Sequence, residues 1–363
     1  DRNKLRNLRR YKRRVSMKLL VCAMEASSNI HLKELKKYLS PDVELLGVFD
    51  KELGNPLYDL TALAIMGIVD ALKKLRFFFK LRDELVELAR DCDKVLLMDS
   101  SGFNLPLAKK LRETYPNKEI IYYILPQAWA WKKGRVKKLE AYCSKLCSII
   151  PFESEIYNDK EKITYVGHPL LDEIKDFKEE LSNTNKIAFM PGSRKTEITN
   201  LMPIFRELIK KIPNKEYILI IPAKFDNDYI KKIYGDIKNF TISKNTHKTL
   251  QESEYAFICS GTATLEAALI GTPFTLSYIA KKFDFFIGKM FVKLNYVGLA
   301  NIFFEKMDKT PLHSEFLQDE VTVENLFNDY KNMNKKLFFD NSKILREYLE
   351  NGSSQNVAKI IQN

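Results

Sequence analysis

Short apolar runs alternate with amphipathic stretches along most of the chain. In the first half this pattern predicts strands at Lys18–Ala23, Val43–Phe49, Lys94–Asp99, Ile120–Ile124, Leu146–Ile150 and Tyr165–Val166. In the second half it predicts strands at Ile187–Met190, Tyr217–Ile221, Phe240–Ser243, Tyr255–Cys259 and Phe274–Tyr278. Strands that alternate with helical patterns are typical of parallel sheets covered by helices. The expected fold class is therefore α/β, with two doubly wound, Rossmann-like domains in tandem.

A polar segment, Asp172–Lys186, separates the two series of strands and is the best candidate for a linker. We expect an N-terminal domain at residues 17–170, a C-terminal domain at 171–340 and a further C-terminal segment at 341–363. Ligands of doubly wound sheets bind beyond the carboxyl ends of the strands, so two such domains that face each other enclose a cleft.

The net charge of +12 is concentrated at one end of the chain. Residues 1–16 hold eight Lys or Arg and one Asp, a charge of +7, which leaves +5 for the rest. Met17 then opens an apolar strand pattern, so residues 1–16 are interpreted as a basic tail outside the fold. A basic arm for nucleic acid or anionic lipid is the alternative interpretation, and we expect no nucleic-acid partner.

No uncharged apolar run of about 18 residues occurs, so no membrane-spanning helix is predicted. The basic tail also lacks the apolar core of a signal peptide. The five cysteines form no CxxC pair, and Cys22, Cys147 and Cys259 lie in apolar segments, which favours buried free thiols in a reducing compartment. These features predict a cytoplasmic protein.

The stretch EYAFICSGTATLEAALIGTP predicts a strand, a bare turn and then a helix at Ala263–Ile270. A helix start carries unpaired N–H groups and about half a positive charge, so it attracts a phosphate. The candidate ligand groups are Ser260, Gly261, Thr262 and Thr264 for a diphosphate and Glu266 for a ribose diol. An N-capped helix with a structural glycine is an equally good interpretation of this stretch alone.

A second strand-turn-helix element, Ile187–Ile198, contains Gly192, Ser193 and Arg194 in its turn. Arginine offers a fixed fork of donors that suits phosphate oxygens. Two anion-suited turns in one domain indicate a nucleotide-diphosphate site. Neither turn has the phosphate-binding pattern of ATPases, and no G-x-G-x-x-G follows a strand, so a nucleotide sugar fits better than ATP or NAD.

The first domain offers carboxylates for proton transfer. Asp99 and Glu25 each come at the carboxyl end of a predicted strand, where a carboxylate can take a proton from an attacking hydroxyl. Helix capping is the alternative role for both residues. The four histidines form no ligand-spaced cluster, and we expect neither a required metal nor a cofactor.

An aromatic and basic loop follows the strand at Ile120–Ile124. It contains Gln127 and the two tryptophans of the chain, Trp129 and Trp131, followed by Lys and Arg. Indoles beside basic groups suit a sugar phosphate or a lipid headgroup. The alternative is a packed loop between domains.

The stretch Leu63–Arg82 mixes apolar and aromatic positions with Lys and Arg, and Lys281–Tyr296 repeats this blend. Such a face suits the surface of an anionic bilayer, whereas a core-facing helix is the ordinary interpretation. Three consecutive Phe residues at 77–79 cannot all face one core, which favours a membrane role. The candidate contacts are Ile68, Leu72, Leu75, Phe78 and Phe79.

A series of ordered motifs gives the chain a resemblance to a known family. They are MEASSN (24–29), AIMGIVDAL (64–72), MDSSGFN (98–104), YYILPQAWAWKKGRV (122–136), PFE (151–153), GHPLLDEI (167–174), MPGSRKTEI (190–198), SGTATLEAAL (260–269) and NYVGLANIF (295–303). From about Met17 to its C-terminus, the chain resembles the lipid-A-disaccharide synthases, which are inverting glycosyltransferases of the GT-B fold.

The resemblance implies a reaction in which UDP-2,3-diacylglucosamine donates its sugar to the 6-hydroxyl of 2,3-diacylglucosamine 1-phosphate. The products are a β-1,6 disaccharide and UDP. By position, Asp99 is similar to the family's essential aspartate, Arg194 to its essential arginine and Asn301 to a functional asparagine, while Glu25 and Ser27 fall in the first-strand loop.

The resemblance also implies a peripheral enzyme on the inner face of the inner membrane, with Leu63–Arg82 as its acyl-chain and membrane-contact region. Family members can form a homodimer by exchanging C-terminal segments, so residues from about Phe338 onward are expected to pack on the first domain or on a partner.

The chain departs from the family pattern at two places. The first-strand loop lacks the family's two glycines and its aspartate, and Gly102 replaces a second acid, which concentrates the base assignment on Asp99. Another GT-B enzyme, such as a UDP-N-acetylglucosamine epimerase, and a sugar-nucleotide or lipid-binding module without catalysis are the rival interpretations.

Overall fold

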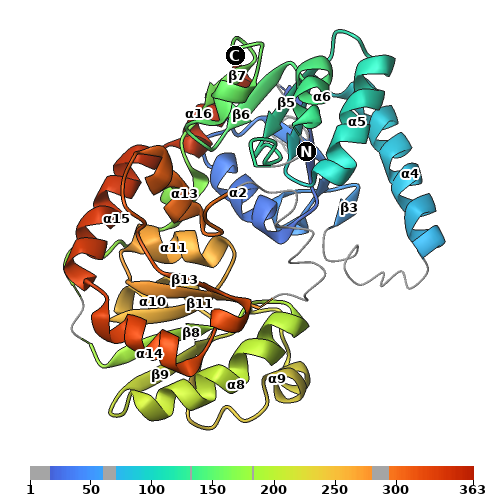
Figure 1. Ribbon diagram of the computed structural model, residues 1–363. Helices are drawn as coiled ribbons and strands as arrows, with labels where there is room; N and C mark the ends of the chain where they lie inside the picture. Colours follow the sequence, from blue (N-terminus) through green and yellow to red (C-terminus); the bar gives the residue numbers. More distant parts are fainter. Residues whose placement is uncertain (1–16, 60–70, 131–132, 182–183, 280–293) are drawn as a thin grey trace, which may run out of the picture. The chain divides into compact units, whose positions relative to one another are not determined.

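The computed structural model describes residues 17–59, 71–130, 133–181, 184–279 and 294–363 (Figure 1). The chain divides into two compact units, Asp1–Glu173 with Asn351–Asn363, and Ile174–Glu350. The chain leaves the first unit three residues beyond the boundary expected from the sequence. Residues 341–350 belong to the second unit, and only the last thirteen residues of the chain return to the first.

The first unit contains a seven-stranded sheet in the order β3-β2-β1-β4-β5-β6-β7. Every pair of neighbours is parallel. The strands are β1 (Met17–Ala23), β2 (Val43–Phe49), β3 (Tyr58–Asp59), β4 (Lys94–Met98), β5 (Glu119–Tyr123), β6 (Lys145–Ser148) and β7 (Ile163–Tyr165). The six predicted strands of this half are confirmed within two residues at most ends, and β3 is an additional edge strand.

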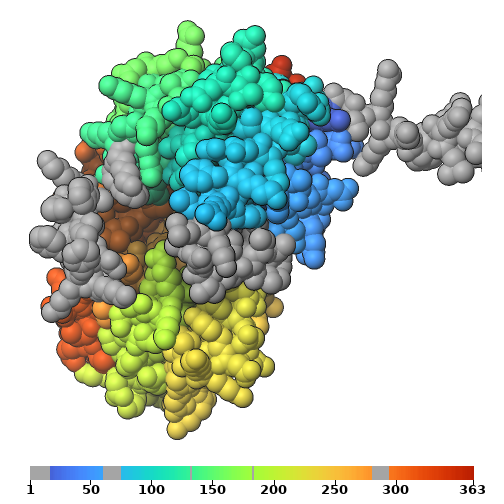
Figure 2. Space-filling model, turned by 90° about the vertical axis from the view of Figure 1, so that its right-hand side faces the viewer, coloured from blue at the N-terminus to red at the C-terminus, as the bar shows by residue number. Residues whose placement is uncertain are grey.

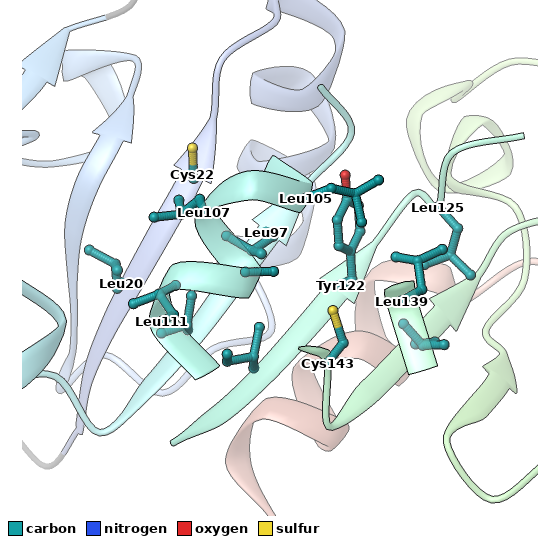
Figure 3. Packing of buried hydrophobic residues seen from close by; sticks show 14 of the residues in the cluster. Leu20, Cys22, Leu97, Leu105, Leu107, Leu111, Tyr122, Leu125, Leu139 and Cys143 are labelled. Carbon is teal, nitrogen blue, oxygen red and sulfur yellow. The ribbon is translucent and has the colours of Figure 1, made fainter. Parts of the chain in front are cut away.

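Helices cover both faces of this sheet, which explains why its strands are continuous apolar runs. The helices are α2 (Ala26–Lys36), α4 (Ala71–Leu88), α5 (Ser101–Thr114), α6 (Gly134–Tyr142), α7 (Pro169–Glu173) and α16 (Ser353–Gln362). Leu20 and Cys22 of β1 pack with α4, α5 and α6, whereas Leu19 and Val21 pack with α2 and α16. Figure 3 shows the first of these two layers, in which strand side chains meet those of α5 and α6.

The second unit contains a six-stranded parallel sheet in the order β10-β9-β8-β11-β12-β13. The strands are β8 (Lys186–Met190), β9 (Glu216–Ile220), β10 (Thr241–Ser243), β11 (Tyr255–Cys259), β12 (Phe274–Tyr278) and β13 (Glu315–Leu317). The helices are α8 (Lys195–Lys211), α9 (Asn227–Tyr234), α10 (Thr246–Glu252), α11 (Thr262–Ile270), α13 (Leu299–Lys306), α14 (Val323–Asn332) and α15 (Lys335–Leu349). The five predicted strands are confirmed, and β13 is additional.

The last helix, α16, packs on α2 and α7 of the first unit (Figure 1). Asp172 caps it, because the carboxylate accepts the backbone N–H groups of Gly352 and Ser354, both at 2.7 Å. The Tyr123 hydroxyl adds a buried hydrogen bond to Ser353 at 2.8 Å. The apolar face of α16 meets Leu32 and the rest of the α2 core. In this structure the end of the chain therefore packs on the first unit of the same chain.

All five cysteines are buried and free, as the sequence predicts for three of them. Among the described helices, none is both long enough and apolar enough to cross a bilayer.

Candidate active site

Asp99 follows β4 directly and has a left-handed backbone conformation, with φ at +50°. Three hydrogen bonds hold it there. The Asp99 carbonyl accepts the Tyr122 hydroxyl at 2.5 Å and the Asn104 amide at 3.0 Å, and the Asp99 N–H donates to the Tyr123 carbonyl at 3.2 Å. A non-glycine residue in this region is strained and persists only when its surroundings fix it. Asp99 is thus pre-positioned at the carboxyl edge of the sheet.

Glu25 lies beside Asp99, because β1 and β4 are neighbours and Ala23 pairs with Met98. The Ser100 hydroxyl donates to the Glu25 carboxylate at 2.9 Å. Side chains of the first turn of α2 hold the end of β1: the Ser28 hydroxyl donates to the Glu25 carbonyl at 2.8 Å, and the Asn29 amide donates to the Ala23 carbonyl at 2.8 Å. Ser27 is exposed in the first turn of α2 and not in a loop.

The carboxyl group of Asp99 has a pKa above its ordinary value. Burial is the largest cause, and the neighbouring Glu25 adds to it through its charge and a hydrogen bond. The Ser100 backbone N–H and His31 oppose the rise. A partly buried carboxylate with a raised pKa and an acidic neighbour is the kind of group that serves in proton transfer.

A histidine that the sequence patterns did not single out lies near this pair. The Nδ1 atom of His31, on α2, contacts the carboxylate of Glu173, on α7, and their side chains are only 12% and 7% exposed. No spacing in the sequence connects the two residues, which are 142 positions apart. Only the docking of α7 on α2 brings them together.

In the second unit, the two anion-suited turns leave neighbouring strands, because β8 pairs with β11. Arg194 stands at the start of α8 with its side chain 79% exposed. The Glu197 carboxylate accepts the backbone N–H groups of Ser193 and Arg194, both at 3.1 Å, and lies 3.3 Å from the Arg194 guanidinium. Gly192 has φ at +101°, and a side chain there would collide with Glu197. The backbone donors of this turn are thus occupied by a carboxylate of the same chain.

The turn before α11 is different, since Gly261 is its N-cap and no side chain caps the helix. Gly261 and Thr262 are exposed, and the space beside Gly261 is open. Thr264 is buried, and its hydroxyl donates to the Gly261 carbonyl at 2.8 Å, so it braces the turn from inside. Glu266 lies 3.8 Å from His247. Ser260 completes the turn at the end of β11.

Asn301 is completely buried, unlike a residue that contacts a ligand directly. Its amide donates to the His313 carbonyl at 2.9 Å and to Glu315 at 2.8 Å, and its oxygen accepts the Leu312 and His313 N–H groups at 2.8 and 3.1 Å. All of these bonds join α13 to the segment that leads into β13. A direct bond from this amide to a nucleotide would require one of them to break.

Residues of the aromatic loop after β5 differ in their exposure to solvent. Gln127 is exposed, whereas the Trp129 ring packs edge-on against Phe152 with 5.2 Å between centroids. The Trp129 indole N–H is buried and has no hydrogen-bond partner among the described residues. Trp131 lies outside the described residues.

The candidate membrane contacts on α4 also differ, since some are exposed and one packs toward the core. Leu75 and Phe79 are 52% and 49% exposed, and Figure 2 shows α4, in light blue, on the surface of the first unit. The Arg82 guanidinium lies 5.2 Å from the centre of the Phe79 ring. Phe78 instead packs toward the core, 5.8 Å from Phe103. Ile68 and the side chain of Leu72 lie outside the described residues.

Each unit thus collects its own part of the predicted site at the carboxyl edge of its sheet. The first unit brings together Asp99 and Glu25, and the second brings together the turns that carry Arg194 and Ser260. Ser27 is two residues beyond Glu25, on the exposed first turn of α2. The two turns are close because β8 and β11 are paired up to Met190 and Ile258, directly before them. In the described parts of the chain, no group of three or more His, Cys, Asp or Glu residues could hold a metal ion.

This architecture is found in solved structures over almost the whole chain. A UDP-GlcNAc 2-epimerase from Neisseria meningitidis, solved with UDP-GlcNAc, aligns with a TM-score of 0.61 at 13% identity and covers 96% of this chain and 100% of its own. The spinosyn rhamnosyltransferase SpnG aligns with a TM-score of 0.56 at 12% identity, over 96% and 100%. The fold is therefore GT-B, with two Rossmann-like units, as predicted.

Sequence similarity narrows this class to one family. A model of the family described as lipid-A-disaccharide synthetase matches residues 19–360. The lipid-A-disaccharide synthase of Helicobacter pylori (strain Shi470) is 49% identical over 352 residues, which cover 94% of this chain and 96% of the relative. The chain belongs to the lipid-A-disaccharide synthase family and is a glycosyltransferase.

A buried acid lies next to the Trp129 contact. Glu153 is 1% exposed, and burial raises its pKa to about 8. The Ser148 hydroxyl lies 2.5 Å from the Glu153 carboxyl and 3.0 Å from the Ile150 carbonyl, and it already accepts the Ile150 N–H at 3.1 Å. One hydroxyl proton cannot serve both acceptors. A protonated Glu153 that donates to Ser148 leaves the Ser148 proton for the Ile150 carbonyl, and the other Glu153 oxygen, Oε1, is buried without a partner among the described residues. Both features favour the protonated acid, so the folded chain retains this proton at neutral pH.

We therefore expect Glu153 to make stability depend on pH. Because its pKa is higher in the folded chain than the ordinary value of 4.5, its contribution is complete below pH 4.5 and is lost as the pH rises toward 8. The free energy of unfolding should fall by about 1.4 kcal/mol per pH unit from this group. In Glu153→Gln this slope should disappear in urea unfolding between pH 5 and 9. The exposed neighbour supplies the control, since Glu155→Gln should keep the wild-type slope, and an unchanged slope in Glu153→Gln would contradict the assignment.

Proposed function

We propose that the chain transfers 2,3-diacylglucosamine from UDP-2,3-diacylglucosamine to the 6-hydroxyl of 2,3-diacylglucosamine 1-phosphate. The acceptor oxygen attacks the anomeric carbon while its proton passes to the Asp99 carboxylate. The bond between the anomeric carbon and the diphosphate oxygen breaks, and UDP leaves with the electron pair. The products are a β-1,6-linked disaccharide 1-phosphate and UDP, with inversion at the anomeric carbon.

The observation that carries this proposal is the fixed carboxylate at the end of β4. Asp99 is held in a strained conformation by three backbone hydrogen bonds, it is partly buried, and its pKa is raised. Strain of this kind clusters at functional sites, and a base works best when its pKa approaches the working pH. Glu25 is the second acid of the pair and raises the pKa of Asp99.

In this mechanism the second unit binds the diphosphate and stabilises it as it leaves. The open start of α11 offers unpaired N–H groups, and the Ser260 and Thr262 hydroxyls stand beside it. The exposed Arg194 guanidinium adds a positive charge one strand away. Fixed positive groups stabilise the charge that develops on a leaving diphosphate, typically by about 3–4 kcal/mol for a well-placed donor.

Replacing Asp99 tests its role as the base. Asp99→Asn keeps the shape of the side chain but cannot accept the proton, so turnover should fall by roughly 100- to 10,000-fold. UDP release from mixed acylated donor and acceptor measures it, and Asp91→Asn, an exposed aspartate before β4, should retain wild-type turnover. Activity of Asp99→Asn close to wild type would refute the base assignment. Turnover of the wild type on non-acylated sugars alone would favour another GT-B reaction.

Replacing Arg194 tests how the leaving diphosphate is stabilised. Arg194→Ala should lower turnover by roughly 100-fold, because a donor to the developing diphosphate charge is lost. Lys210→Ala, at the opposite end of α8, is the matched control and should be near normal. The assignment of Arg194 would be abandoned if its alanine variant released UDP at the control rate.

We propose as well that the enzyme works at a membrane surface, which suits substrates with two acyl chains. Leu75 and Phe79 are one turn apart on α4 and are exposed beside Lys80 and Arg82. Aromatic and aliphatic side chains rimmed by cations bind anionic headgroup regions. The inner face of the inner membrane is the corresponding site in a bacterium.

This surface is tested by sedimentation with vesicles of phosphatidylglycerol and phosphatidylethanolamine. The double variant Leu75→Ser, Phe79→Ser should bind about tenfold more weakly, since two half-exposed apolar side chains are removed. Ile242→Ser removes an equally exposed apolar side chain from the second unit and should bind like the wild type. Equal binding of all three proteins would exclude α4 as the contact.

A further inference from the structure

The backbone is strained at the end of β5, directly beside the end of β4. Ile124 follows β5 and has a left-handed conformation, with φ at +60°. A β-branched residue rarely adopts this conformation, and such strain persists only where the surroundings fix it. In the described parts of the first unit, the other non-glycine residues with φ in this region are Asp99 and Ser100. The strained non-glycine residues of this unit therefore all follow two neighbouring strands.

The left-handed turn changes the side of the sheet on which Ile124 lies. In an extended strand, successive side chains point to opposite faces. Tyr122 packs in the layer formed with α4, α5 and α6 (Figure 3), and Tyr123 packs in the layer formed with α2 and α16. A regular strand would return the next side chain to the first layer, but Ile124 packs against the second. The strained conformation thus holds Ile124 on the α2 side of the sheet.

Asp99 is the neighbour of Ile124 across the sheet. Met98 pairs with Tyr123, and the Asp99 N–H donates to the Tyr123 carbonyl at 3.2 Å, so the pairing continues up to the two strained residues. Paired strands lie about 5 Å apart. Glu25 is the N-cap of α2 and therefore stands on the side to which Ile124 turns. A partly buried apolar side chain is thus placed beside the two acids of the candidate site.

An apolar neighbour changes the surroundings of a carboxylate in two ways. It removes water that would hydrate the charged form, which agrees with burial as the largest cause of the raised pKa of Asp99. It also fills space from which a water molecule could pass a proton to the carboxylate and attack in place of a sugar hydroxyl. Exclusion of water is a general way in which enzymes prevent hydrolysis of a reactive substrate.

We propose that Ile124 is a positioning residue that shields Asp99 from water, so that the sugar hydroxyl and not water attacks the donor. The inference deepens the proposed function and rests on Asp99 being the base. In the competing step, a water oxygen bonds to the anomeric carbon and one of its protons passes to the Asp99 carboxylate. The bond to the diphosphate oxygen breaks, and UDP leaves with the electron pair. The products are free 2,3-diacylglucosamine and UDP.

The test compares hydrolysis with transfer when UDP-2,3-diacylglucosamine and the acceptor are both present. Ile124→Asn suits the left-handed backbone better than isoleucine and brings a polar side chain to Asp99. Its ratio of free sugar to disaccharide should rise about tenfold over the wild type, because water then reaches the base. Ile124→Val keeps a branched apolar side chain and should keep the wild-type ratio. Ile360→Asn changes an isoleucine on α16 that packs against the same apolar layer, and its ratio should not change.

A merely structural role for Ile124 would lower hydrolysis and transfer together, and an unchanged ratio in Ile124→Asn would overturn the proposal. An equal rise of the ratio in Ile124→Val or in Ile360→Asn would overturn it as well. If Ile124→Asn failed to fold, as judged by urea unfolding, Ile124→Ala would take its place, since a smaller side chain also admits water. The same outcomes would then decide.

A second readout separates this inference from the proposed function. Carboxyl-carbon NMR of labelled aspartate, with the Asp99 signal assigned from its loss in Asp99→Asn, measures the pKa of Asp99 without turnover. This pKa should be lower in Ile124→Asn than in the wild type, because water can hydrate the charged carboxylate. A lower pKa supports the inference even if the enzyme proves to use other substrates. An unchanged pKa would sink it even if the transfer reaction is confirmed.

Discussion

The pairing of β1 with β4 is the constraint on which the candidate site depends. Ala23 lies opposite Met98, so the chain delivers Glu25 and Asp99 to the same edge from neighbouring strands. Both faces of these strands are apolar and buried, so the hydrophobic pattern specifies their register only weakly. Polar bonds at the strand ends supply the missing specificity. Asn104 is fully buried, and its amide spans the Met98 and Asp99 carbonyls at 3.0 Å each, which fixes where β4 stops.

In both units the candidate groups follow neighbouring parallel strands, but the groups have opposite charge. In the first unit, adjacent strand ends gather carboxylates, whereas in the second they gather backbone donors and an arginine. The two turns of the second unit are not equivalent, because Glu197 occupies the donors before α8 while the start of α11 remains open. The backbone of the α11 turn can therefore meet an anion without displacing a carboxylate. The Arg194 guanidinium, whose side chain is 79% exposed, can do so only through the nitrogens that do not face Glu197.

The sequence predicts the fold well because buried parallel strands are long apolar runs with helical stretches between them. The edge strands β3 and β13 were missed, since two and three residues carry no periodic signal. Motif spacing also placed Asp99, Arg194 and the α11 turn at the carboxyl ends of strands, where the structure has them, and their roles stay predictions. It could not tell whether a side chain faces a ligand or its own backbone, which is why Thr264 and Asn301 appeared as ligand groups while their polar atoms bond within the protein. The contact of His31 with Glu173 depends on tertiary docking and has no local signature.

The buried cysteines can report local unfolding of each unit. Cys22, Cys92, Cys143 and Cys147 belong to the first unit and Cys259 to the second. Burial raises the pKa of the Cys92 thiol to about 11 and that of Cys143 to about 12, so neither forms a thiolate in the folded chain at neutral pH. An alkylating reagent can therefore modify them only after local unfolding. The rate at which each thiol is modified then reports the opening of each unit separately, with no label added to the chain.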